Sequence, residues 1–235
     1  MDRDDFVEQV TGVAALAEPI RRELYLYVAA QPEPVSRDEA SEGVGIPRHT
    51  AKFHLDRLVD DGLLDTDYKR LSGRAGPGAG RPTKLYRRSD RQVSVDLPER
   101  HYDLAGQIMA TAIEESVREG RSVLDALHRS AADLGATVGR RARIEGLGDL
   151  DGNDPMAATV RALAAQGYEP HTTQNTITLA NCPFAALARE HTELVCGMNL
   201  ALVGAIAATL SEGDLAPRLD PADGRCCVVL AGRPA

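Results

Sequence analysis

The four cysteines of the chain carry its most distinctive chemistry, and all of them lie in the last 54 residues: Cys182, Cys196, Cys226 and Cys227. Gaps of 13 and 29 residues between them do not fit a compact zinc knuckle. In a reducing cytosol, cysteines more often bind metals, sense redox changes or lie buried than form disulfides. The thiols are therefore candidates for a metal or cluster site, and the alternative is that they are ordinary buried core residues.

A basic segment at the other end of the chain offers a second kind of chemistry. Between residues 69 and 91, eight Lys or Arg side chains accompany a single acid, Asp90. This segment carries a charge of +7 and the remainder carries −15, in a chain of formal net charge −8. Because salt screens charges beyond about 8–10 Å, an acidic protein can still present such a patch to phosphates. DNA contact is favoured over a solvated charged loop.

The elements around this segment are predicted to form a helix–turn–helix. Apolar residues at helical spacing predict helices over 5–30, divided at Pro19. A capping box introduces a short helix over 37–42, and the glycines within 43–45 supply a tight turn. A second helix follows from about 47 to 61.

This second helix has the layout of a DNA recognition helix, with one apolar face and polar side chains in its N-terminal half. Arg and Lys can read guanine edges, and Thr can contact a thymine methyl group or a phosphate. Strands over 63–69 and 82–88 enclose a Gly-rich basic loop, which is typical of a wing that contacts phosphates or the minor groove. The predicted DNA-binding residues are Arg48, His49, Thr50, Lys52, Arg74 and Arg81.

The stretch IPRHTAKFHLDRLVDDGLL, followed by GRPTKLYRRS, resembles the winged helix–turn–helix regulators of the ArsR-like superfamily. The residues that match the hallmark helix of these regulators are Thr50, His54, Leu55, Leu58, Gly62, Leu63 and Leu64. The metal-binding CxC found on the corresponding helix of some ArsR repressors is absent, which disfavours a metal sensor of that type. His54 falls beside the packed face, so a structural or phosphate-contacting role is favoured over metal binding.

The predicted fold class is α+β with three regions. Residues 1–96 form the winged-helix DNA-binding domain, and 97–145 form long helices. These helices are expected to carry a dimer contact, because palindromic operators mirror the two-fold symmetry of a homodimer. Packing within one subunit is the alternative. Residues 146–235 are predicted to form a small α/β sensor domain that contains the cysteines.

The predicted elements place the thiols at three locations. Cys182 lies at a strand-to-helix junction, Cys196 lies near the start of the next helix, and the Cys226-Cys227 pair lies on the last strand. Because neighbours on a strand point to opposite faces, at most one of the pair is expected to face a common site. Three thiols would then converge and leave one coordination position open. Zinc would need a fourth ligand, for which His191 is a candidate, and an iron–sulfur cluster also uses thiolates.

The blocks NCPFAALAREHTELVCGMN and LDPADGRCCVVL resemble the C-terminal domain of the SufR family, the iron–sulfur repressors of cluster-assembly operons. The resemblance implies a homodimer with one cluster, expected to be [4Fe–4S], in each subunit. Cys182, Cys196 and one of the last two cysteines, taken here as Cys226, would be ligands. It also implies a repressor of iron–sulfur assembly genes whose affinity for a double-stranded operator falls when the cluster is lost or oxidised. The fourth ligand stays open between His191, an acidic residue and a group from a partner domain.

Two other functions are compatible with parts of the sequence. A zinc- or small-molecule-responsive regulator could use the same scaffold. Cys182 and His191 could instead serve as the nucleophile and base of an enzyme, but no orienting partner is identifiable and the wing would be unexplained. An enzyme is therefore not expected. The chain shows no long apolar run and no signal peptide, so a cytoplasmic location without membrane contact is expected.

Overall fold

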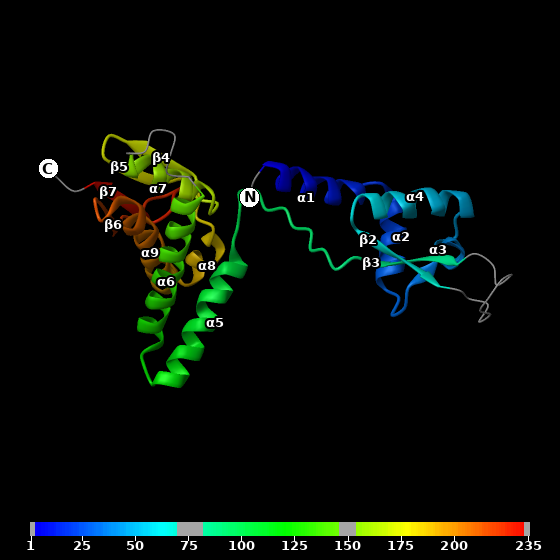
Figure 1. Ribbon diagram of the computed structural model, residues 1–235, viewed down its shortest axis with the longest axis horizontal. Coiled ribbons are helices and arrows are strands. Elements are labelled where there is room, and N and C mark those ends of the chain that lie inside the picture. Colours follow the sequence, from blue (N-terminus) through cyan, green and yellow to red (C-terminus); the bar gives the residue numbers. More distant parts are fainter. Residues whose placement is uncertain (1–2, 70–81, 146–153, 233–235) are drawn as a thin grey trace. The chain divides into compact units, whose positions relative to one another are not determined.

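The computed structural model describes residues 3–69, 82–145 and 154–232. The chain divides into two compact units, Asp2–Val95 and Asp96–Ala235 (Figure 1). Two of the predicted DNA-binding residues, Arg74 and Arg81, lie outside the described residues.

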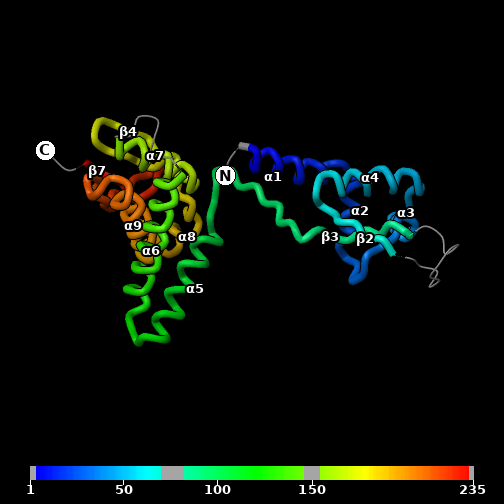
Figure 2. Tube along the Cα trace, in the orientation of Figure 1, coloured from blue at the N-terminus to red at the C-terminus, as the bar shows by residue number. Residues whose placement is uncertain are grey.

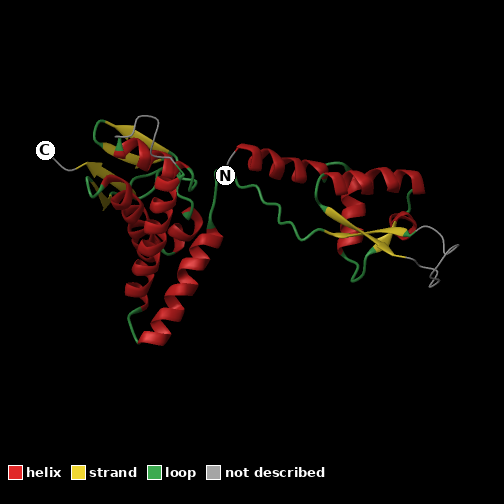
Figure 3. Ribbon diagram, viewed as in Figure 1, coloured by secondary structure: helices red, strands yellow, loops and turns green. Residues whose placement is uncertain are grey.

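Among its described residues, the first unit combines four helices with a three-stranded antiparallel sheet of order β1-β3-β2 (Figure 3). In the core of this unit, one face of α4 (Arg48–Asp60) packs against the other helices and against residues of the sheet. The described elements are α1 (Arg3–Ala15), α2 (Pro19–Ala29), β1 (Val35–Ser36), α3 (Arg37–Val44), α4 (Arg48–Asp60), β2 (Leu64–Lys69) and β3 (Thr83–Arg88).

Local signals in the sequence account for the boundaries of these helices. Pro19 opens α2, and the Glu18 carboxylate accepts hydrogen bonds from the first backbone N–H groups of that helix. The capping box before α3 is formed: Ser36 Oγ accepts from Glu39 N at 3.3 Å, and the Glu39 carboxylate accepts from Ser36 N at 2.7 Å. Gly45 ends α3 with a φ of 72°, a left-handed conformation that favours glycine and makes the turn toward α4.

In its described part, the second unit combines helices with a four-stranded antiparallel sheet of order β4-β5-β7-β6. Helices α5 and α6 form an antiparallel hairpin (Figure 2). The described elements are α5 (Tyr102–Glu119), α6 (Val123–Ile144), α7 (Pro155–Ala164), β4 (Pro170–Thr173), β5 (Thr176–Leu179), α8 (Ala185–Glu190), α9 (Thr192–Ser211), β6 (Leu215–Leu219) and β7 (Val228–Gly232).

Close packing of α6 on α9 dominates this unit. A Cβ atom on Gly135 would lie 2.3 Å from the carbonyl oxygen of Leu202, and one on Gly139 would lie 2.7 Å from Cβ of Thr209. The two glycines, one helical turn apart, therefore let the two backbones approach each other. Residues 97–145, expected to form a separate region, thus share one core with the cysteine-bearing segment. The expected boundary at residue 145 falls inside this unit.

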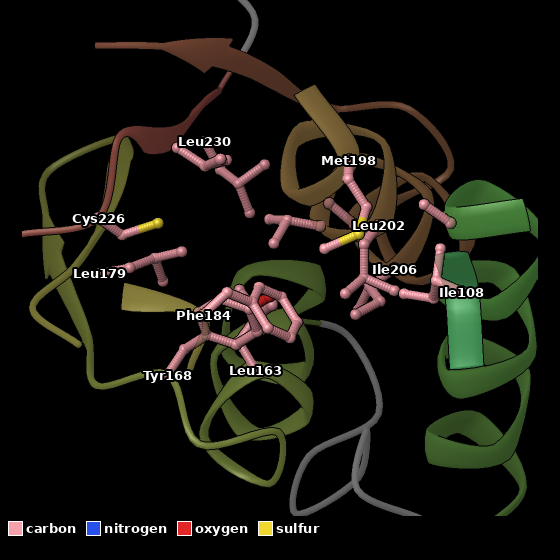
Figure 4. Close-up of a cluster of buried hydrophobic side chains, with 14 of the residues drawn as sticks. Ile108, Leu163, Tyr168, Leu179, Phe184, Met198, Leu202, Ile206, Cys226 and Leu230 are labelled. Atoms are coloured by element: carbon pink, nitrogen blue, oxygen red, sulfur yellow. The ribbon is translucent and has the colours of Figure 1, made fainter. Parts of the chain in front are cut away.

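Helix α9 runs through the middle of that core. Among the described helices, it is the one whose length and mean hydropathy of 1.9 would suit a membrane span. However, 61% of its apolar stretch is buried inside the protein, as is usual for a helix that forms the centre of a core. Figure 4 shows its side chains Met198, Leu202 and Ile206 among the buried residues, together with Cys226. Cys226 is therefore part of the hydrophobic core.

Candidate thiol site and nucleic-acid interface

All four cysteines line a single cavity of about 580 Å³ in the second unit. Cys182 lies between β5 and α8, and Cys196 is the fifth residue of α9, in agreement with the locations predicted for them. Cys226 and Cys227 lie in the connection between β6 and β7. Three segments that are distant in sequence therefore bring their thiols to one place.

The prediction that one of the last two cysteines turns away from the site was wrong. It rested on strand alternation, but β7 begins at Val228, so neither cysteine belongs to the strand. Backbone hydrogen bonds fix the connection instead: Cys226 N donates to Leu179 O at 2.8 Å, and Asp220 N donates to Cys227 O at 2.7 Å. Both thiols line the same cavity, which therefore has a fourth cysteine beside the three that were expected to converge.

Hydrogen bonds among the thiols divide them into two kinds. Contact with the Cys226 thiol lowers the pKa of both Cys182 and Cys227. The pKa of Cys227 falls to about 6, while the pKa of Cys226 is raised by its bonds to Cys182 and Cys227 and by burial. Burial raises the pKa of Cys196 to about 12. The lowered pKa of each of the two half-buried thiols, Cys182 and Cys227, makes the thiolate, the form that binds metals, more accessible.

A buried chain of hydrogen bonds holds Cys226 in its position. Asn199 Nδ2 donates to Cys226 Sγ at 3.2 Å, and the hydroxyl of Tyr168 donates to Asn199 Oδ1. All three residues are at most 2% exposed. Asn199 was not predicted as a site residue, although a lone amide in the apolar run of α9 was the available signal, since a buried amide needs partners.

Three arginines line the cavity, against one described carboxylate, that of Asp223. Arg100 Nη1 donates to the carbonyl oxygen of Cys182 at 3.1 Å and also to Asn181 Oδ1. Arg225 donates to the carbonyl oxygen of Cys226 at 3.2 Å. Arg189 is the third arginine of the lining. This cationic frame suits an anionic group such as a set of thiolates.

His191, a candidate fourth ligand, does not line this cavity. It lies between α8 and α9 and lines a different hollow of about 500 Å³ together with His128, Glu190 and Glu193. The structure therefore gives no support to His191 as a ligand beside the thiols or as a base for Cys182. Within the described ranges, no three Cys, His, Asp or Glu side chains are grouped as they would be around one metal ion.

The predicted recognition helix is α4. Its buried face consists of Ala51, Leu55 and Leu58, each fully buried. The N-terminal half is outward: Arg48, His49 and Lys52 are exposed, and Thr50 is half-buried. Because the remaining predicted contacts lie in the wing loop outside the described residues, the DNA-binding roles of these side chains stay predictions.

Residues 16–67 match the family model of a helix–turn–helix domain. The match spans α2, the turn between α3 and α4, the whole of α4 and most of β2. No curated protein and no solved structure matches the chain. The matched domain, with the hairpin of β2 and β3 after it, supports a winged helix–turn–helix protein of the ArsR-like kind. The chain is thus indicated to be a DNA-binding transcriptional regulator.

Proposed function

We propose that the protein is a repressor whose operator binding is controlled by an iron–sulfur cluster held in the thiol cavity. The observation that carries this proposal is the convergence of four cysteines, from three segments, on one cavity in a chain with a helix–turn–helix domain. The SufR-like sequence blocks supply the cluster as the expected occupant. Iron–sulfur assembly genes are the proposed targets, and a homodimer on a palindromic operator in the cytoplasm is the proposed functional form.

The residues present fit such a group. Cys182, Cys196 and Cys226 are the proposed ligands, and Cys227 replaces His191 as the candidate for the fourth position because it lines the same cavity. In a [4Fe–4S] cluster each of four cysteine thiolates binds a different iron. The four cysteines on this one cavity supply that number of ligands.

The chain's own residues would set the properties of the site. When bound, the cluster would supply sensitivity to oxygen and to iron supply. Asn199 donates to one ligand sulfur, and the three arginines offset the negative charge of the thiolates. Arg100 also ties Cys182 to the segment that precedes α5, because its Nη1 donates to the carbonyl oxygen of Cys182. Loss of the bond between Cys182 and the cluster would therefore first change the segment around Arg100, which precedes α5.

Anaerobic purification followed by iron, sulfide and visible-absorbance measurements tests this function. We expect about four irons and four sulfides per chain, and tighter binding of loaded protein than of apo protein to an operator selected from random duplex DNA. Single Cys→Ser variants at all four positions identify the ligands, and Cys227→Ser separates a four-thiol site from a three-thiol site.

Two outcomes would count against the proposal. Colourless protein that binds its operator equally well with Cys182, Cys196 and Cys226 replaced by Ser would rule out thiol control. Stoichiometric zinc without sulfide would support the alternative, a zinc-responsive regulator on the same scaffold.

A further inference from the structure

A cleft in the first unit, distinct from the thiol cavity, lies between α3, α4 and β3. It has a volume of about 580 Å³. Four cations and two carboxylates line it, which leaves a net charge of +2: Arg37, Arg48, Lys52, Lys84, Asp38 and Asp56. The cleft joins the recognition helix to a strand of the wing.

Asp56 is the central residue of this cleft. Its carboxylate accepts hydrogen bonds from Lys84 Nζ at 2.7 Å, from Lys52 Nζ at 2.9 Å and from the Tyr86 hydroxyl at 3.0 Å. Burial alone would raise the pKa of Asp56, but these donors outweigh it and lower the pKa to about 2. The carboxylate therefore stays ionised at neutral pH and holds two ammonium groups together, one from α4 and one from β3.

Hydrogen-bonding capacity in the cleft remains unused. An ammonium group has three donors, and Asp56 engages one from each lysine. Lys52 and Arg48 keep 59% and 61% of their side-chain surface exposed. Nε of Arg37 is buried and, within the described chain, has no hydrogen-bond acceptor; the Asp38 carboxylate oxygen with which it forms an ion pair lies 3.5 Å away. An oxyanion in the cleft would find several free donors.

We propose that this cleft binds a backbone phosphate of duplex DNA, with Lys52 and Lys84 as its ligands and Asp56 as the residue that positions them. The inference rests on DNA binding by the helix–turn–helix domain and is independent of the cluster. A DNA phosphate is favoured over a free anion because the walls of the cleft are the recognition helix and a wing strand, the two elements that a bound duplex contacts. The exposed ion pair of Arg48 with Asp38 is weak enough to exchange for a phosphate contact.

The test uses the full chain and a duplex of about 30 base pairs of arbitrary sequence, since phosphate contacts do not depend on sequence. Its dissociation constant is measured as a function of salt. Lys84→Gln and Lys52→Gln should each weaken binding about 3- to 10-fold and make the slope of log K against log salt shallower by about 0.9. Arg57→Gln is the matched control, because Arg57 is an exposed, ion-paired residue of the same helix that does not line the cleft.

Asp56→Asn separates positioning from simple charge. The variant keeps both lysines and removes a negative charge, so electrostatics alone predicts tighter binding and a steeper slope. If Asp56 positions the lysines, binding becomes weaker instead, and Tyr86→Phe, which removes one hydrogen bond to Asp56, weakens it less. Circular dichroism melts establish whether each variant is folded. If Asp56→Asn does not fold, the test relies on Tyr86→Phe.

Each remaining outcome has a definite meaning. Tighter binding by Asp56→Asn, or equal slopes for Lys84→Gln and Arg57→Gln, would overturn the inference while leaving the regulator intact. Inorganic phosphate that competes at constant ionic strength, together with an unchanged DNA slope in Lys84→Gln, would identify a free-anion site and also overturn it. Failure of the wild-type chain to bind any duplex would instead contradict the proposed function itself.

Discussion

Asn199 connects the hydrophobic core to the thiol site through one side chain. Its amide donates to Cys226 Sγ, and its carbonyl oxygen accepts from the Tyr168 hydroxyl, all in a buried environment. A buried polar group that loses its partner costs more than the hydrogen bond itself contributes, because the remaining group is desolvated without compensation. Stability in this part of the core therefore depends on the pair rather than on either residue.

A double-mutant cycle tests this dependence. Asn199→Leu should lower the free energy of unfolding by about 1–3 kcal/mol, because it leaves the Tyr168 hydroxyl buried without an acceptor. Adding Tyr168→Phe should restore part of that loss, since both polar partners are then absent. Urea unfolding of apo protein gives the four values. If the loss of unfolding free energy in the double variant equals the sum of the losses in the two single variants, Tyr168 and Asn199 do not act as a hydrogen-bonded pair.

Asp56 should make the first unit less stable at acid pH. Its pKa is about 2 in the folded protein, against about 3.9 in an unfolded chain. Because the folded value is depressed, the stabilisation is fully present above about pH 4 and is lost as the pH falls toward 2. After a discount for solvent screening, wild type should lose about 1–2 kcal/mol more than Asp56→Asn between pH 6 and pH 2. Parallel pH profiles for the two proteins would contradict this.

At the scale of elements, the contact between α6 and α9 positions the segment that bears Cys196. The two helices approach closely only because α6 has glycine where α9 presents backbone, as at Gly135. Gly106 of α5 offers the opposite case, since an added Cβ there would meet no atom within 4 Å. The two positions form a natural pair for separating helix propensity from packing.

Gly135→Ala should destabilise the second unit by about 1–3 kcal/mol, because the new Cβ would push against the carbonyl of Leu202. Gly106→Ala should instead be neutral or stabilising by up to about 1 kcal/mol, since alanine is the better helix former and meets no obstacle. Thermal unfolding of the two variants measures both effects. Equal effects of the same sign would show that the helices can separate without cost.

Most of the first unit could be predicted because its signals are local. A proline opens α2, a capping box opens α3, and an apolar face defines α4; each depends only on residues a few positions apart. The two-residue strand β1 has no periodicity of its own and exists only through pairing with Tyr86 and Leu85 of β3. Tertiary pairing also sets the start of β7 at Val228, which is why the positions of Cys226 and Cys227 were predicted incorrectly.

The sequence predicted that three thiols would converge on one site, but it did not predict the residues that surround them. Arg100 lies 82 positions from Cys182, and Asn199 lies 27 positions from Cys226, so only the fold brings each of these pairs together. The same holds for the contact of Asp56 with Lys84, which spans 28 positions. Motifs thus indicated which residue types matter, while long-range partners needed the structure.

At the scale of the whole molecule, the two kinds of chemistry are divided between the two units. The recognition helix and the cationic cleft lie within 2–95, while the four cysteines and their described partners lie within 96–235. Each unit has its own hydrophobic core, so each is expected to fold as a separate chain. Separate fragments should therefore retain separate halves of the proposed function.

Fragment 96–235 should take up the same iron and sulfide per chain as the full protein, because every proposed ligand and hydrogen-bond partner lies in it. Fragment 1–95 should bind duplex DNA without any response to chelators or air, and with an affinity at least about 10-fold lower if the full chain binds as a dimer. Metal analysis and DNA titration of both fragments, with the full chain as control, provide the readout. A fragment 96–235 that folds by circular dichroism yet takes up no iron would show that the first unit contributes to the site, and a DNA-binding response to air in fragment 1–95 would place the sensor elsewhere.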